Sequence, residues 1–405
     1  MRVLFLSQLL PFPLDAGPKL RSYYVLRYLA EAGHQVTLVC FVRPNDRRTH
    51  LQALRQYCHC IETIPLLRSR LKDLTFGMGS LCTSKPFLIL RDQVKSMDLK
   101  LEQILARQSF DAFHVDQLGM APYATRRSRP ILKVLDQHNA VFTVPLRMAQ
   151  GCRNPIIKTL LQQEAFKLRK FERQTCESFD RVVWVTDQDR AALDLPKPCA
   201  AARDTVIPIA TDPTIQMPVR RPWPFRVTFI GGMHWPPNAE GIHWFFEKIW
   251  PRVIRQMPRL VLTVIGSSPP KKIVQSRSSN IQILGYVTNL KPYLAETAVC
   301  IVPLRSGAGM RVKILDAWCW GIPIVSTSLG AEGMRAKHRE NLLIADEEES
   351  FANSIVEAVG DQSLARRSRR TVGRRSESHY HWRELINHGT RSTTEDPIRS
   401  SLSTE

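Results

Sequence analysis

The sequence lacks several features that would define a function class directly. No apolar run approaches the roughly 18 residues that a membrane-spanning helix needs. Although the formal net charge is +20, the 405 residues contain no helix-turn-helix, zinc-finger or RNA-recognition motif, so we expect no nucleic-acid partner. Neither half contains a G-x-G-x-x-G motif at the start of a helix, which argues against a dinucleotide-dependent dehydrogenase.

The nine cysteines also lack the spacing of a metal site. Cys58 and Cys60 form a C-x-C pair, and no second pair follows at the spacing of a zinc ligand set. Most of the others stand singly or among apolar residues, as reduced thiols of a protein core do. We therefore expect a cytoplasmic protein. The positive charge favours an anionic membrane surface as a partner, on the inner face of the plasma membrane.

Short apolar runs alternate with helical patterns along the whole chain. Strands are predicted over 3–7, 35–42, 112–115, 131–135, 181–186, 226–230, 260–265, 281–284, 299–303 and 322–327. Helices are predicted over 20–31, 156–177, 239–254 and 290–296. Because a chain of this length exceeds one ordinary core, the pattern predicts an α/β fold with two domains. Each is a Rossmann-like, doubly wound parallel sheet, and the two face a central cleft.

Changes in composition predict where these domains begin and end. The N-terminal domain is predicted over 1–208 and the C-terminal domain over 226–365. The segment 209–225 contains four prolines and is expected to be a stiff linker. The arginine-rich segment 366–387 is predicted to be a basic helix that crosses back to the N-terminal domain. The Ser/Thr-rich tail 388–405 is predicted to be disordered.

The most informative stretch is an apolar strand that runs into Gly307 and Gly309 and then into a predicted helix. That helix is expected to carry Arg311, Lys313 and Asp316. A glycine loop between a strand and a helix presents free backbone N–H groups to an anion. Two cations and a carboxylate within about two helical turns would complement a diphosphate and a ribose. The stretch therefore predicts a nucleotide-sugar site.

Several strings in a consistent order resemble one family. They are PFPLDAG (11–17), GHQVT (33–37), DQHN (136–139), FIGGMHWPPN (229–238), ILGYVTNLKPYL (283–294), GAGMRVKILD (307–316) and GIPIVST (321–327). Taken together they resemble the GT-B glycosyltransferases of glycosyltransferase family 4, of the bacterial exopolysaccharide type.

The resemblance implies a retaining, hexosyltransferase-like reaction in polysaccharide biosynthesis. A nucleotide-sugar donor, bound as substrate by the C-terminal domain, would give its glycosyl group to a saccharide or lipid-linked acceptor on the N-terminal domain. Neither a cofactor nor a metal is implied. Because negative charge grows on the diphosphate as the glycosidic bond breaks, fixed donors aimed at it would stabilise the transition state.

The resemblance also implies which residues contact the donor. Asp316 matches the second acid of the family's Glu-x7-Glu motif, which binds the ribose hydroxyls. Ala308 stands in place of the first acid, so sugar contacts there would pass to backbone N–H groups. Lys313 and Arg311 are expected as catalytic contacts to the diphosphate, with Lys313 preferred because residues two apart do not share a helix face. The implied donor-binding set is Gly17, Gly231, Gly232, Gly307, Ala308, Gly309, Met310 and Asp316.

In the N-terminal domain the resemblance singles out His138 as a third catalytic residue. It would lie beside the donor sugar and position the reacting hydroxyls, with Asn139 holding its ring. It would not act as a general base, because a phosphate oxygen takes the acceptor proton in same-face transfer. Gly17, in the loop after the first strand, would lie near the sugar-phosphate.

Two other functions remain open at this point. A nucleotide-sugar epimerase of the same fold would need paired carboxylates around the donor sugar, which Ala308 argues against. A catalytically silent nucleotide-sugar-binding protein is favoured by the missing first acid and by the shorter Asp316. The basic and partly apolar segment 66–100 is compatible both with an anionic bilayer and with ordinary solvated helices.

Overall fold

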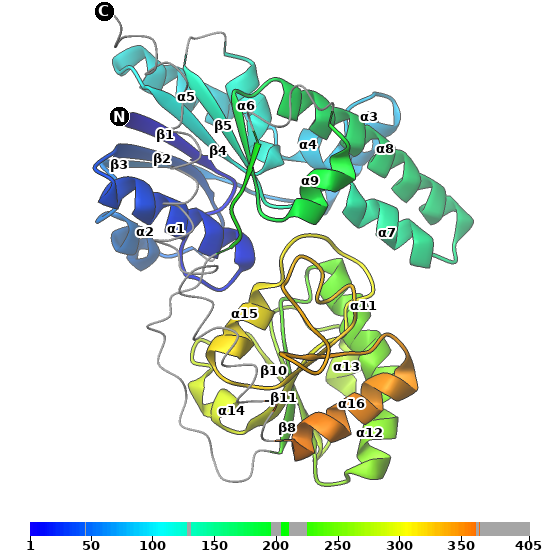
Figure 1. Ribbon diagram of the computed structural model, residues 1–405. Helices are drawn as coiled ribbons and strands as arrows, with labels where there is room; N and C mark the ends of the chain where they lie inside the picture. Colours follow the sequence, from blue (N-terminus) through cyan, green and yellow to red (C-terminus); the bar gives the residue numbers. More distant parts are fainter. Residues whose placement is uncertain (45, 128–130, 196–203, 210–224, 362–363, 365–405) are drawn as a thin grey trace, which may run out of the picture. The chain divides into compact units, whose positions relative to one another are not determined.

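The computed structural model describes residues 1–44, 46–127, 131–195, 204–209, 225–361 and 364. The chain divides into two compact units, and the division falls between Ala210 and Thr211 (Figure 1). Of the predicted linker 209–225, only the two end residues belong to the described part. The predicted basic helix 366–387 and tail 388–405 lie outside the described residues.

The N-terminal unit is built on a parallel sheet of seven strands in the order β3-β2-β1-β4-β5-β6-β7. The strands are β1 (Arg2–Ser7), β2 (Gln35–Val42), β3 (Cys60–Pro65), β4 (Ala112–Asp116), β5 (Leu132–Gln137), β6 (Arg181–Trp184) and β7 (Asp204–Val206). The helices are α1 (Gly17–Glu31), α2 (Arg48–Leu54), α3 (Arg70–Leu81), α4 (Phe87–Arg91), α5 (Lys95–Arg107), η1 (Leu118–Met120), α6 (Ala121–Thr125), α7 (Thr143–Gly151), α8 (Pro155–Glu177) and α9 (Asp187–Leu193).

Both faces of this sheet are buried. Successive residues of β1 alternate between two hydrophobic clusters, with Leu4 and Leu6 in one and Phe5 in the other. The same alternation continues in β2, where Val39 joins the first cluster and Leu38 the second. A strand buried on both faces needs apolar residues at every position, which is why the sequence shows continuous apolar runs here.

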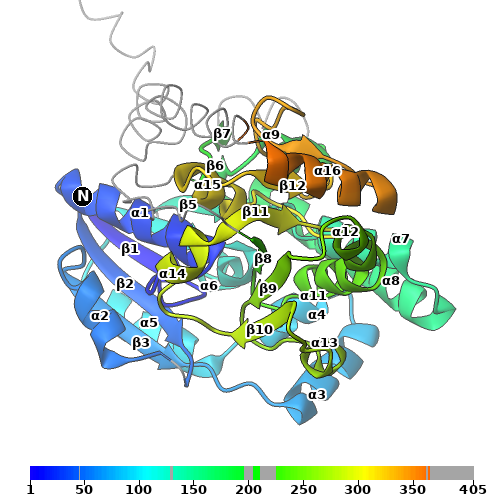
Figure 2. The ribbon, with the colours of Figure 1, turned by 90° about the horizontal axis from the view of Figure 1, so that it is seen from below.

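The C-terminal unit repeats the plan with six parallel strands in the order β10-β9-β8-β11-β12-β13, of which Figure 2 labels β10 to β12. The strands are β8 (Arg226–Ile230), β9 (Val261–Ile265), β10 (Ile281–Gly285), β11 (Thr297–Val302), β12 (Ile324–Ser326) and β13 (Leu343–Ile344). The helices are α11 (Pro236–Trp244), the π-helical turn η2 (Phe245–Ile249), α12 (Trp250–Gln256), α13 (Lys271–Gln275), α14 (Lys291–Ala295), α15 (Val312–Cys319) and α16 (Glu348–Gly360). The prediction of two doubly wound α/β domains is confirmed.

Several element bounds differ from the sequence prediction. The predicted helix 239–254 is interrupted by the π-helical turn η2, just before Pro251. Proline has no N–H for the carbonyl four residues earlier and its ring clashes with it, so the backbone widens locally. Strands β3, β7 and β13 were not predicted, because they are short or only half-buried.

The order of strands locates one ligand position in each unit. In the N-terminal sheet the order reverses between β1 and β4, and in the C-terminal sheet it reverses between β8 and β11. Ligands of open α/β sheets bind outside the carboxyl ends of the strands at such a reversal. Most of the residues singled out from the sequence lie in the segments that follow these strand ends.

Candidate functional site

In the C-terminal unit, the carboxyl end of β8 is joined to α15 by a chain of polar contacts. Lys313 Nζ donates a hydrogen bond to Asn238 Oδ1 at 2.9 Å. Asn238 Nδ2 in turn donates to the carbonyl oxygen of Gly232 at 2.9 Å. A Cβ atom at Gly231 would lie 2.9 Å from Lys313 Nζ and from Asn238 Nδ2, so any side chain there would displace these two groups from their present positions. The structure thus brings together Gly231, Gly232 and Lys313.

Lys313 has the electrostatics of an anion-binding cation. Burial, and then repulsion from Arg311, lower the pKa of Lys313 to about 7. The ammonium lies 4.8 Å from the centroid of the Phe229 ring, and that face offers partial compensation for lost water. No carboxylate in the described part of the chain pairs with Lys313. A bound anion would supply the countercharge that is missing.

The loop between β11 and α15 takes a shape that only glycine adopts readily. Gly307 has φ of 113° and Gly309 has φ of 78°, in the region disfavoured for residues with a side chain. The guanidinium of Arg311 donates to the carbonyl oxygens of Ala308 and, at 2.6 Å, Gly309. Within the described residues, the N–H groups of Ala308 and Gly309 have no acceptor. The loop therefore offers two N–H donors to a ligand.

Arg311 differs from its prediction in position. It precedes the helix as the N-cap residue of α15, which begins at Val312. Its guanidinium holds the glycine loop through the carbonyl contacts just described. Arg311 provides no side-chain cap and the first turn of α15 has no acid, so the positive end of the helix is open to an anion. A direct contact of Arg311 or of Met310 with a diphosphate remains a prediction.

Asp316 lies two-thirds of the way along α15 and is half-buried. Burial raises the pKa of Asp316 to about 7. No residue in the described ranges forms a hydrogen bond or an ion pair with its carboxyl group. A carboxyl group that has lost water without gaining a donor would be stabilised by a ligand hydroxyl. Its expected role at a ribose remains a prediction.

In the N-terminal unit, parallel register places three polar residues at one edge of the sheet. Ser7 on β1 is opposite Asp116 on β4, and Asp116 is opposite Asp136 on β5. All three are fully buried and lie at or near the carboxyl ends of their strands. His138 follows β5 directly, so this edge carries the histidine that the sequence singled out.

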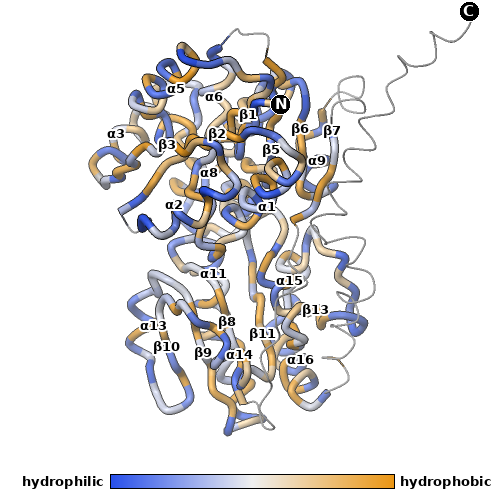
Figure 3. The backbone as a smooth tube through the Cα atoms, turned by 90° about the vertical axis from the view of Figure 1, so that its left-hand side faces the viewer, coloured by the Kyte–Doolittle hydropathy of each residue, from blue (hydrophilic) through white to orange (hydrophobic). Residues whose placement is uncertain are grey.

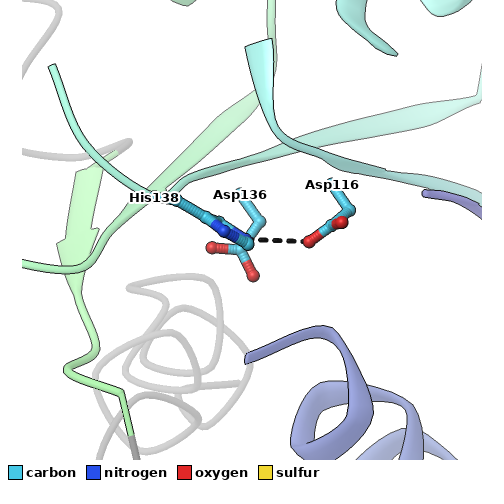
Figure 4. Close-up of side chains that lie close together, drawn as sticks. All are labelled: Asp116, Asp136 and His138. Carbon is cyan, nitrogen blue, oxygen red and sulfur yellow. Dashed lines mark hydrogen bonds and ion pairs between the residues drawn. The ribbon is translucent and has the colours of Figure 1, made fainter. Parts of the chain in front are cut away.

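Asp116 fixes the ring of His138. Its Oδ1 accepts a hydrogen bond from His138 Nε2 at 2.8 Å (Figure 4). Its Oδ2 accepts from the hydroxyl groups of Ser7 and Ser22, each at 2.9 Å. The Nδ1 atom of His138 is buried and has no partner among the described residues. The expectation that Asn139 holds the ring is wrong, because the ring nitrogen bonds to Asp116 instead.

A buried ion pair stands beside this histidine. Arg21 on α1 contacts both carboxylate oxygens of Asp136, with Nε–Oδ2 and Nη2–Oδ1 distances of 3.1 Å. Its Nη1 atom also donates to the carbonyl oxygen of Ile207 at 2.7 Å. Burial alone would raise the pKa of Asp136, but Arg21, His114 and His138 hold that pKa well below its ordinary value. Asp136 is therefore ionised.

The same cluster has the composition of a small metal site but not its charge. Ligand atoms of Asp116, Asp136 and His138 lie within 4.8 Å of one another. A cation bound there would face the guanidinium of Arg21, which already occupies both oxygens of Asp136. Two positive charges in one buried cluster of side chains repel strongly. These residues therefore do not fit a metal ion.

The loop after His138 is held by a buried acid of α8. Glu172 accepts hydrogen bonds from the backbone N–H groups of Val141 at 2.9 Å and Phe142 at 3.3 Å. The side-chain amide of Gln137 donates to the same carboxyl group. Burial raises the pKa of Glu172 to about 8. Because Gln137 and Val141 flank His138, these bonds fix the backbone that carries the histidine.

Gly17 lies at the start of a helix rather than in a loop. It is the first residue of α1, ahead of Pro18, and is half-buried. The N-cap residue Ala16 provides no side-chain hydrogen bond, and the first turn contains no acid. A contact between Gly17 and a sugar-phosphate remains a prediction.

Among the residues of these clusters that had no role in the sequence analysis, Asp116, Asn238, Arg21 and Glu172 make the central contacts. Asp116 follows the predicted strand 112–115 directly, and its place at a strand end was a usable signal. Asn238 ends the string around the glycine pair. Arg21 and Glu172 stand in helical patterns, where nothing local distinguishes them from solvated residues.

Comparison with known proteins agrees with the two-domain fold. Residues 224–361 match the family model described as glycosyl transferases group 1. Sucrose-phosphate synthase from Thermosynechococcus elongatus aligns with 97% of this chain and 98% of its own, with a TM-score of 0.70 and 17% identity. The Anabaena protein HepE, solved in complex with UDP-glucose, aligns with 97% of this chain and 99% of its own, with a TM-score of 0.66 and 12% identity. The fold is GT-B.

A curated sequence is similar along most of the chain. It is an "uncharacterized 44.6 kDa protein in cps region" of Klebsiella pneumoniae, 24% identical over 387 residues, which cover 88% of this chain and 90% of that protein. The family match and the GT-B neighbours together support a glycosyltransferase.

Proposed function

We propose that this chain is a retaining, metal-independent glycosyltransferase of family 4 that acts in polysaccharide biosynthesis. It moves a sugar from a nucleotide-sugar donor to a saccharide or lipid-linked acceptor. The observation that carries the proposal is the half-buried ammonium of Lys313, which has no countercharge among the described residues and a pKa lowered to about 7. Lys313 lies in the first turn of α15, directly after the loop that carries the free N–H groups of Ala308 and Gly309.

The reaction breaks one bond and forms another at the anomeric carbon. The bond from that carbon to the diphosphate oxygen breaks, and the acceptor oxygen attaches on the same face of the sugar. The acceptor proton passes to a diphosphate oxygen, and the nucleoside diphosphate leaves. Lys313, the two loop N–H groups and the open end of α15 stabilise the negative charge that develops on the leaving group. Asp316 accepts hydrogen bonds from the ribose hydroxyls.

His138 positions the donor sugar and moves no proton in this scheme. Asp116 holds its Nε2 atom, so the ring presents a fixed edge to the sugar hydroxyls. The ion pair between Arg21 and Asp136 supports a metal-independent reaction, because it places a positive charge on one of the two acids that a metal in this cluster would need.

The comparisons support the choice of donor and pathway. HepE has been solved with UDP-glucose, which supports a uridine nucleotide sugar as the first donor to test. The Klebsiella relative belongs to a cps region, which supports polysaccharide biosynthesis. A silent binding protein stays the second candidate, because Ala308 replaces the expected first acid.

The test incubates the purified protein with radiolabelled UDP-glucose, with and without a bacterial lipid extract. Transfer of label to lipid or saccharide supports the proposal. Conversion of the sugar without acceptor would indicate an epimerase, and binding without either would indicate a silent protein. Lys313→Met should abolish transfer. Lys337→Met, at an exposed lysine paired with Glu340, is the matched control and should leave transfer unchanged.

A further inference from the structure

Helix α3 and the residue segment before it carry a row of large apolar side chains in solvent. Five of them are between 59% and 78% exposed: Leu67, Leu71, Leu74, Met78 and Leu81. From Leu71 onward they recur every three or four residues, so they share one face of the helix. We call these five residues the α3 stripe. Single exposed apolar residues are ordinary, but a continuous row of them marks an interaction surface.

The α3 stripe lies on the outside of the N-terminal unit. Figures 2 and 3 both show α3 at the periphery of that unit, and the hydropathy colouring in Figure 3 shows apolar positions along it. The helix is attached through its far end, where Lys167 on α8 donates to the carbonyl oxygen of Ser80. Ser80 itself is buried. The helix is thus anchored by Ser80, and the stripe is left uncovered.

Positive charge flanks the α3 stripe. Between residues 67 and 86 the sequence has four basic residues and one acid, Asp73. Arg68 is engaged by Asp92. Lys72 and Lys85 are exposed, and no carboxylate among the described residues pairs with either of them. Two uncompensated ammonium groups beside an apolar row are complementary to a surface that is both anionic and apolar.

We propose that the α3 stripe docks the protein on an anionic lipid bilayer. The apolar side chains enter the boundary between headgroups and acyl chains, and Lys72 and Lys85 contact lipid phosphates. None of the described helices combines the length and the hydrophobicity needed to cross a bilayer. The contact proposed here is interfacial, because it uses one face of a helix of 12 residues. The proposal stands on the surface of α3 and does not depend on the transfer reaction.

The bilayer is preferred over a second copy or a partner protein because of charge. The whole chain has a net charge of +20, so two copies repel each other, whereas an anionic bilayer attracts the protein. A partner protein would need to be acidic and apolar along one helix length. The bilayer has both properties at every point of its surface.

The test is co-sedimentation of the full chain with vesicles of phosphatidylcholine, with or without one-third phosphatidylglycerol. Wild type should bind the anionic vesicles and bind the neutral ones much more weakly. Leu71→Gln/Leu74→Gln should lower the affinity for anionic vesicles at least tenfold, since each leucine loses its transfer from water. Lys72→Gln/Lys85→Gln should lower it about 30-fold at low salt. Leu99→Gln, at an isolated leucine that is 59% exposed on α5, is the matched control and should bind as wild type does.

Several results would overturn the proposal. The proposal is wrong if wild type binds no vesicles or binds neutral and anionic vesicles equally. It is also wrong if the Leu99→Gln control loses as much binding as Leu71→Gln/Leu74→Gln does. Concentration-dependent self-association that Leu71→Gln/Leu74→Gln abolishes, without vesicle binding, would assign the stripe to a second copy. Thermal unfolding of each variant should match wild type, because all substituted side chains are exposed. Since no nucleotide or acceptor is present, failure here leaves the transferase proposal intact, and the reverse also holds.

Discussion

Binding of a nucleotide sugar should depend steeply on pH, because Lys313 is close to half-neutral near pH 7. Its pKa is lowered to about 7 by burial and by Arg311. The diphosphate of a nucleotide sugar would place negative charge beside it and favour the protonated form. Only protein with protonated Lys313 would then bind the diphosphate tightly, and affinity should fall as the pH rises through 7.

The size of this effect follows from the pKa. If the bound diphosphate restores the ordinary lysine value of about 10, the dissociation constant is inversely proportional to the fraction of free protein in which Lys313 is protonated. With a free-protein pKa of about 7, the dissociation constant for UDP-glucose should rise about 30-fold between about pH 6 and about pH 8.5, or ~2 kcal/mol. Binding at pH 7 should also take up about half a proton per site.

Isothermal titration calorimetry in buffers of different ionisation enthalpy measures both quantities. Asp316 titrates in the same range, because burial raises its pKa to about 7, so a control must isolate the lysine. Lys313→Arg keeps its charge throughout and retains only the part of the pH dependence that belongs to Asp316. Equal slopes for wild type and Lys313→Arg, or binding without proton uptake, would refute the reasoning.

Asp316→Ala should weaken UDP-glucose binding tenfold or more, because a hydrogen bond to a charged group contributes ~1.5–3 kcal/mol; unchanged affinity by calorimetry would refute the ribose role. His138→Ala should cut turnover with little loss of nucleotide affinity, since the histidine positions the sugar, and a fully active variant would remove it from the site. In the folded protein burial raises the pKa of Glu172 to about 8, whereas a glutamate in the unfolded chain has a pKa of about 4.3. The stability that comes from the bound proton is therefore present in full below about pH 4 and is lost as the pH rises through about 8. Glu172→Gln does not titrate, so its unfolding temperature should fall less than that of wild type between about pH 5 and about pH 9; parallel curves would contradict this.

Strands buried on both faces were the elements best predicted from the sequence. The predicted ranges 35–42 and 226–230 agree with β2 and β8, because a central parallel strand requires an unbroken apolar run. The edge strand β3 (Cys60–Pro65) was missed, since its half-buried face tolerates Glu62 and Thr63. The number of consecutive buried residues, rather than the intrinsic strand preference of the residues, decided which strands could be predicted from the sequence.

The glycine loop was predicted for a local reason. Gly307 and Gly309 adopt positive φ, and that requirement is visible in the residues themselves. The contact between Lys313 and Asn238 has no such signal, because the two residues are 75 positions apart. The bond between Arg21 and Asp136 spans 115 positions and was likewise invisible.

The sequence by itself determined two parallel α/β sheets, the turns that need glycine, and the loop and helix that carry Lys313 and Asp316. These depend on apolar runs and backbone conformations that neighbouring residues decide. Only the tertiary structure decided which side chains meet at the strand ends and what charge they carry. Strand register sets Asp116 opposite Asp136 and so brings Asp116 within hydrogen-bond distance of His138, and burial shifts the pKa values of Lys313 and Glu172. The contact and the pKa shifts both depend on residues that are distant along the chain, so no local sequence pattern indicates them.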